Sequence, residues 1–196
     1  MNAIQVGYLL SSGTTGFVAG CSVSQPETPT LGALVRVSLD KDYSIYGMIT
    51  GLHIGDDGMV RQLVTAGNIS PEVMRDNRER RIVPLEMAVL AVGFEVDGKI
   101  SHLLPPRPPL SLDVISLCPE SDLKRFIGAG HFGYFRHILR AEDIPVGEVL
   151  AAHLLDVKRR TGNVEWVNEA TRELITLLRD DYATLMAVLG ALGEVY

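Results

Sequence analysis

The sequence has few cysteines, few aromatic residues and no excess of positive charge. Its 196 residues include two cysteines, 6% aromatic residues, and 24 acidic against 18 basic side chains, for a net charge of −6. Two cysteines are too few for a disulfide framework or a cysteine-rich zinc site. The acidic balance excludes a uniformly basic nucleic-acid binder. With 46% hydrophobic and 21% charged residues, the chain has the composition of a globular protein rather than a disordered one.

Long apolar runs and nucleotide-binding motifs are also missing. Charge or glycine interrupts every apolar stretch well short of the about 20 residues that a membrane-spanning helix needs. The start of the chain has no secretion-signal pattern, so we expect a cytoplasmic protein with no membrane contact. The glycine-rich segment 13–20 has no lysine, which excludes a phosphate-binding loop, and the five histidines lack zinc-site spacing. We therefore expect no cofactor, no metal and no nucleotide hydrolysis.

The residue pattern of the chain changes near residue 117. Before this point, short apolar runs alternate with turn residues, and Gly47 and Gly51 interrupt a run rich in β-formers. Glycine inside a strand indicates a bulge or a barrel corner. We predict an α+β fold with a small β-barrel over residues 1–117 and a helical domain over residues 118–196. A β-sandwich is the rival architecture for the first part.

The second part carries helix start and stop signals. Pro119 and Pro145 suit first helical turns, Gly162 suits a helix end, and Asn163 suits an N-cap. The last helical stretch has an apolar stripe with two open uses, packing on the barrel or self-association. Its members are Val164, Val167, Leu174, Leu178, Leu185, Val188 and Leu192.

Two arginine-containing segments are candidate contacts for a partner or a phosphate group. The first is a cluster of Arg75, Arg78, Arg80 and Arg81, whose net charge is reduced to +2 by Asp76 and Glu79. It is either a solvated loop with local ion pairs or a contact with phosphate or an acidic surface. The second is Arg107, inside the proline-rich segment 104–110. That segment is either a rigid strap, on which Arg107 pairs with a neighbouring acid, or a ligand for a proline-recognising domain.

No catalytic residue can be assigned from the sequence. Cys118, His102 and Asp113 could form a nucleophilic constellation, but their spacing does not bring them together, and such sites are recognised by geometry. The candidates for acid–base chemistry, which qualify only because they titrate, are Glu86, Glu95, Asp113 and His102. Glu86 would indicate a function if it pointed into the barrel.

The first part also resembles a known family. Gly7, Phe17, Leu31-Gly32 and the strand Leu34 to Val37 lead to Ile45-Tyr46-Gly47-Met48, which is similar to a valine-tyrosine-glycine-valine strand. This pattern resembles the HAS-barrel, the N-terminal β-barrel of HerA-type DNA-translocating ATPases and of the alpha and beta subunits of rotary ATP synthases. The resemblance covers roughly residues 1–115. It implies a barrel that packs beside like barrels or docks to a ring; the ATPase core of those families has no counterpart here.

We therefore expect a non-enzymatic assembly or adaptor module. Its expected partners are further copies of the chain, in a homo-oligomer, or a HerA-like DNA-processing ATPase, the latter implied by the resemblance alone. One alternative is a barrel that binds single-stranded nucleic acid, with Tyr8, Phe17, Tyr43 or Tyr46 as stacking residues. An enzyme of unrecognised type is the other alternative.

Overall fold

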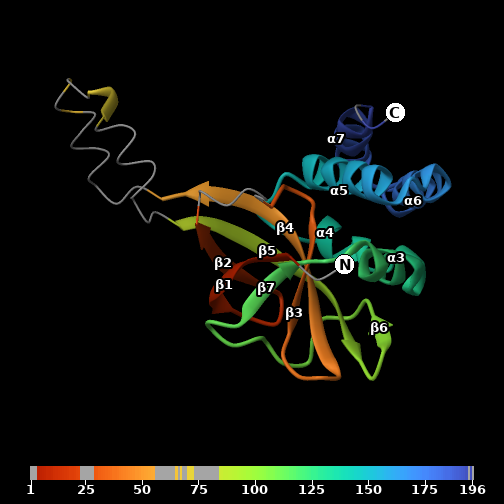
Figure 1. Cartoon of the computed structure of the whole chain (residues 1–196). Helices are drawn as coiled ribbons and strands as arrows, with labels where there is room; N and C mark the ends of the chain where they lie inside the picture. The colour runs from red at the N-terminus through yellow and green to blue at the C-terminus, as the bar shows by residue number, and fades with distance from the viewer. Residues whose placement is uncertain are drawn as a thin grey trace.

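The computed structural model describes residues 4–22, 29–55, 65, 67, 70–72, 84–193 and 195 (Figure 1). Within these ranges the chain forms strands first and helices second. The strands are β1 (Ile4–Ser12), β2 (Gly16–Ser22), β3 (Leu34–Ser38), β4 (Tyr43–Ile54), β5 (Pro84–Val96), β6 (Lys99–Ser101) and β7 (Val114–Leu117).

The helices follow from residue 120 onward. They are α3 (Glu120–Gly128), a 3-10 turn (Gly130–Phe132), α4 (Phe135–Leu139), α5 (Val146–Thr161), α6 (Val164–Leu177) and α7 (Tyr182–Leu192). The predicted signals lie at helix ends, although Pro119 and Pro145 are the N-caps of α3 and α5 rather than members of their first turns. Gly162 ends α5 with a φ of 67°, a conformation that glycine adopts without steric cost. Asn163 caps α6, because its side chain accepts a hydrogen bond from the Trp166 N–H at 2.9 Å.

The strands in the part of the chain that the structure describes form a closed barrel. The order β2-β1-β7-β3-β4-β5 is completed by a pairing of β2 with β5, so six strands form a ring, and the short β6 extends from β5. Every pairing is antiparallel. The predicted α+β fold, with a β-barrel followed by a helical segment, is confirmed, and the sandwich alternative is wrong. Closure satisfies the backbone groups that open sheet edges would leave unpaired.

Gly47 explains how β4 bends inside so small a barrel. The β4–β5 register shifts between Tyr46 and Gly47, which marks an irregularity of the β-bulge type. A Cβ atom at Gly47 would lie 2.4 Å from Val89 Cγ1 and 2.8 Å from Phe17 Cζ. A side chain at this position would therefore collide with the packed interior of the barrel.

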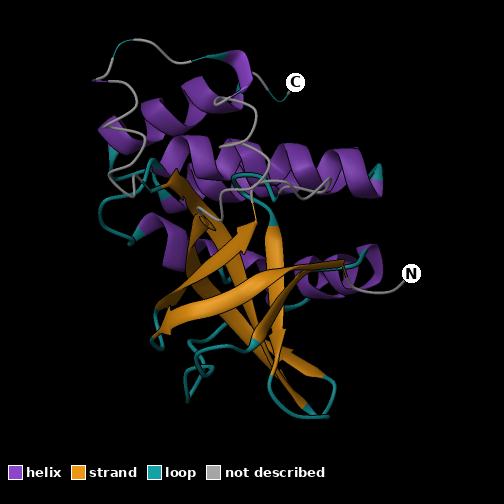
Figure 2. Cartoon of the chain, turned by 60° about the vertical axis from the view of Figure 1, so that its left-hand side comes forward, coloured by secondary structure: helices purple, strands orange, loops and turns teal. Residues whose placement is uncertain are grey.

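Two hydrophobic cores share the barrel wall. The first fills the barrel with inward side chains such as Val6, Leu9 and Ile45. The second lies between the helices and the outer surface of β3, β4 and β5, and includes Tyr46 and Met48. Figures 1 and 2 show the helices grouped on one side of the barrel. Because strand side chains alternate, β4 is buried on both faces from Tyr43 to Thr50.

The second core also absorbs most of the predicted apolar stripe. Val167, Leu174, Leu178, Val188 and Leu192 are buried in it, and Leu185 packs against it. Val164 is the exception and is half exposed. Packing on the chain's own core is therefore the main use of this stripe. None of the helices in the described part of the chain is long and apolar enough to cross a membrane.

Candidate functional site

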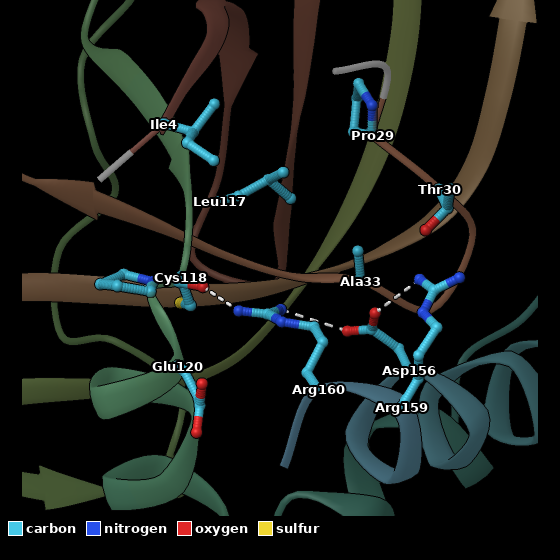
Figure 3. A pocket seen from close by; sticks show the side chains of 11 residues that line it. Ile4, Pro29, Thr30, Ala33, Leu117, Cys118, Glu120, Asp156, Arg159 and Arg160 are labelled. Atoms are coloured by element: carbon cyan, nitrogen blue, oxygen red, sulfur yellow. Dashed lines mark hydrogen bonds and ion pairs between the residues drawn. The ribbon is translucent and has the colours of Figure 1, made fainter. Parts of the chain in front are cut away.

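A pocket of about 530 Å³ lies where the barrel meets the last turns of α5 (Figure 3). The barrel and the helices both contribute to it, since its walls come from the start of β1, the segment before β3, the end of β7 and α5. The lining residues are Ile4, Pro29, Thr30, Ala33, Leu117, Cys118, Pro119, Glu120, Asp156, Arg159 and Arg160. We call this the junction pocket.

The floor of the junction pocket is a row of three charged side chains on α5. Asp156 is buried and accepts hydrogen bonds from Arg159 and Arg160, each at 3.2 Å. Helical geometry brings them together, because residues three and four apart share a face. Arg160 also donates to the Cys118 carbonyl, so it links α5 to the end of β7 (Figure 3). The row therefore joins the helices to the barrel.

The rim carries one more acid. Glu120 opens α3 and pairs with Lys124 at 2.5 Å, one helical turn further on. This ion pair lowers the pKa of the Glu120 carboxyl. Two guanidinium groups thus share one carboxylate on the floor, while the rim acid has its own counter-ion.

The hypothetical nucleophilic constellation is not assembled. The Cys118 thiol lines the junction pocket, and burial raises its pKa far above the ordinary value, so it stays protonated and unreactive. His102 is buried elsewhere, with Nε2 3.1 Å from the Phe126 carbonyl and its ring against Tyr134. Asp113 accepts the Leu110 N–H at 2.7 Å in a turn. His102 and Asp113 are thus each engaged in hydrogen bonds of their own, away from the buried thiol.

Glu95 belongs to a buried polar network between the barrel and α3. It accepts hydrogen bonds from Tyr46 Oη at 2.7 Å and from Arg125 Nη2 at 2.6 Å. Arg36 approaches Glu95 to 3.8 Å and donates to Asp122 at 2.7 Å. Burial raises the pKa of the Glu95 carboxyl, but these hydrogen bonds and charges outweigh burial, and the pKa falls below its usual range. The network holds α3 on the barrel.

The sequence did not reveal that network, because its members lie far apart along the chain and meet only when the barrel closes.

Strand alternation resolves the position of Glu86. Its neighbours Leu85 and Met87 fill the barrel interior, so the Glu86 side chain points outward. The outward position removes the functional indication that an inward carboxylate would have given.

The two predicted arginine segments have different outcomes. Arg75, Arg78, Arg80 and Arg81 lie outside the described residues. Arg107 Nη2 pairs with Asp40 Oδ2 at 2.6 Å. This is the acid pairing expected of a strap; a contact of Arg107 with a partner or a phosphate stays a prediction.

Aromatic packing strengthens the attachment of this strap. The Arg107 guanidinium lies 4.8 Å from the centre of the Tyr43 ring. Tyr43 Oη donates to the Arg107 carbonyl at 3.3 Å. Pro105 and Pro109 are buried, whereas Pro106 and Pro108 are exposed. The segment therefore lies fastened along the barrel by its central arginine and two of its prolines.

A second candidate site is an exposed apolar surface on β1, β7 and the turn before β7. Leu110 and Leu112 are 69% and 76% exposed, and the neighbouring strand residues Tyr8, Leu10 and Val114 are between 41% and 50% exposed. Tyr8 pairs with Val114 across the β1–β7 ladder, so these side chains lie together. We call this surface the β1–β7 face. Alternation along β1 could have predicted its outward residues, but not which barrel face the helices would leave uncovered.

No protein-family model matches the chain, and no curated protein matches its sequence. The functional inference therefore rests on the geometry of the junction pocket and of the β1–β7 face.

Proposed function

We propose that the protein is a non-enzymatic assembly module whose barrel docks through the β1–β7 face onto the barrel of a second copy. The observation that carries this proposal is the division of the outer barrel surface. The helices cover β3, β4 and β5, whereas the β1–β7 face leaves five large apolar side chains in water. A contiguous exposed apolar patch of this kind is typical of an interaction site.

The charge of the β1–β7 face favours a second copy as its occupant. The strands β1, β2 and β7 contain no charged residue, although the chain as a whole carries a net charge of −6. Asp113, in the adjoining turn, directs its carboxylate at the Leu110 N–H. Two copies that meet here bury no unpaired charge and keep their acidic surfaces apart.

Leu112 is held in an exposed position at a cost to the backbone. Its φ is 71°, a left-handed conformation that is unfavourable for a branched side chain. Three hydrogen bonds fix the turn: Leu112 N–H to the Leu9 carbonyl at 2.8 Å, Leu9 N–H to the Asp113 carbonyl at 3.0 Å, and Leu110 N–H to Asp113 Oδ2. A rigid turn presents Leu112 without the entropy loss that a mobile loop would incur on docking.

The chemistry of the buried groups also supports a non-enzymatic role. The Cys118 thiol is protonated, and Glu95 is occupied by Tyr46 and Arg125. Most of the aromatic residues that a nucleic-acid-binding barrel would need for base stacking are not accessible. Phe17, Tyr43 and Tyr46 are buried, and Tyr8 is the half-exposed member of that set. The resemblance to barrels that pack side by side points in the same direction.

Co-expression of a tagged and an untagged copy tests the proposal. We expect the tagged copy to retrieve the untagged one in both low and high salt, because an apolar contact is not weakened by screening. Leu112→Asp in both copies should abolish retrieval. Retrieval that survives this substitution, or recovery of nucleic acid that is lost in high salt, would reject the proposal. Recovery of a barrel-containing ATPase in place of the second copy would replace the proposed partner.

A further inference from the structure

The junction pocket has the size and the walls of a small-molecule site. Its volume of about 530 Å³ falls inside the range of about 300–1,000 Å³ typical of ligand pockets. One side of the cavity is apolar and is formed by Ile4, Ala33 and Leu117, together with two prolines. In Figure 3 Ile4, Ala33 and Leu117 lie opposite the charged row on α5. The pocket is therefore amphipathic, with an apolar wall and a polar floor.

The charge balance of the floor selects an anion. Asp156 is shared by Arg159 and Arg160, and the rim acid Glu120 is paired with Lys124. These groups together leave one positive charge in excess beside the cavity. A cationic ligand would find no unpaired carboxylate among these side chains, whereas an anion would compensate the surplus guanidinium charge.

Arg159 is the side chain able to meet such an anion. It contacts Asp156 through Nη2 alone, and no hydrogen bond to another described residue occupies its Nε or Nη1. Its side chain lines the pocket and is 69% exposed. Arg160 is less available, because it spans Asp156 and the Cys118 carbonyl. The free N–H groups of Arg159 can therefore bind a carboxylate while an apolar chain enters the pocket.

We propose that the junction pocket binds an aliphatic monocarboxylate, with its chain against Ile4, Ala33 and Leu117 and its carboxylate on Arg159. The site is separate from the β1–β7 face and does not depend on the assembly function proposed above. Because Arg159 stands on α5, whereas Ile4 and Leu117 belong to β1 and β7, a ligand held between them bridges the helices and the barrel. Binding is thus expected to stabilise the junction of the two.

Octanoate is a suitable probe, and 1-octanol is its uncharged counterpart. Titration at pH 7, followed by backbone amide NMR shifts, should show saturable binding of octanoate. Its shifts should be confined to residues around 29–33, 117–120 and 156–160. Arg159→Gln should weaken octanoate binding by about fivefold while leaving octanol binding unchanged, since a charge-assisted contact at an exposed site is modest in strength.

Arg179→Gln is the matched control. Arg179 is 75% exposed and pairs with Asp180 away from the pocket lining, so this variant should bind octanoate like the wild type. The proposal is overturned if octanoate gives no saturable shifts, if octanoate and octanol bind equally well, or if the two variants behave alike. Both substituted arginines are exposed, and neither substitution is expected to prevent folding.

Discussion

His153 joins three parts of the molecule through one buried imidazole. It lies on α5, its Nδ1 is 3.0 Å from the Gly32 carbonyl, and its Nε2 is 2.8 Å from Tyr134 Oη. The carbonyl must accept a hydrogen bond, so Nδ1 carries the proton and Nε2 accepts from the tyrosine. The ring is therefore neutral, and both of its nitrogens are engaged in hydrogen bonds.

The protonation of His153 gives a pH-dependence prediction. Burial lowers the pKa of His153 from 6.5 to about 4, although its hydrogen bond to Gly32 opposes that shift. Below pH 6.5 the unfolded chain binds a proton at this residue that the folded chain rejects until about pH 4. The contribution of neutral His153 to the free energy of unfolding is therefore complete above pH 6.5 and is lost as the pH falls toward 4. The loss amounts to roughly 3 kcal/mol.

Urea unfolding from pH 7 to pH 4 measures this contribution. His153→Gln should be less stable at pH 7, and its stability should fall less on acidification than that of the wild type. His53→Gln is the control, because His53 is exposed on β4 and its removal should leave the wild-type profile. An unchanged acid slope in the His153 variant would contradict the assignment of a neutral, buried imidazole.

At the scale of single elements, α3 is attached to the barrel by ion pairs around the buried Glu95 carboxylate. Glu95 holds Tyr46 and Arg125, and Arg36 holds Asp122. The proline strap is attached by an exposed pair, Arg107 with Asp40, whose side chains are 60% and 64% exposed. Water reaches both partners of the second attachment, whereas in the first the Glu95 side chain is only 9% exposed although Arg125 is 45% exposed, so the two should differ in their effect on stability.

Substitution of one acid in each attachment tests this difference. Glu95→Gln should lower the free energy of unfolding by about 2 kcal/mol, because it leaves the buried Tyr46 hydroxyl and the partly exposed Arg125 without a charged acceptor. Asp40→Asn should lower it by less than about 1 kcal/mol. Denaturant titration of both variants at pH 7 measures the losses. Equal losses would show that burial does not distinguish the two attachments.

Glycine has opposite roles in β4 and α7. At Gly47 an added Cβ would meet Val89 and Phe17 inside the barrel, whereas at Gly190 it would meet no atom within 4 Å beyond its neighbours in the helix. Gly47→Ala should destabilise the fold by about 2 kcal/mol through overpacking. Gly190→Ala should stabilise α7 by up to about 1 kcal/mol, because alanine is the better helix former. Thermal unfolding checks both signs, and a harmless Gly47→Ala would contradict the tight packing at this bend.

At the scale of the whole molecule, local signals in the sequence predicted the classes of structure well. Gly47 and the closely spaced strands indicated a small barrel, and Gly162 and Asn163 marked helix boundaries that the structure confirms. These features depend on a residue's own backbone or on neighbours in sequence. A small barrel can therefore be predicted from them without knowing which strands pair.

The candidate sites could not be predicted in the same way. The junction pocket combines Ile4 with Asp156, and the Glu95 network combines Arg36 with Arg125. Such contacts arise only when the helices settle on one side of the barrel. The β1–β7 face depends on the same event, because the helices determine which outward residues remain in water. Long-range packing, rather than local propensity, thus creates each surface with a proposed role.

Sedimentation velocity across a concentration series tests the assembly claim most directly. The wild type should pass from monomer to dimer as its concentration rises, in low and in high salt. Leu112→Asp should stay monomeric, and aspartate is suited to the left-handed backbone at this position. Met186→Asp, at a half-exposed apolar residue on α7, should dimerise like the wild type. A wild type that remains monomeric at high concentration, or a Leu112→Asp variant that dimerises normally, would contradict the account.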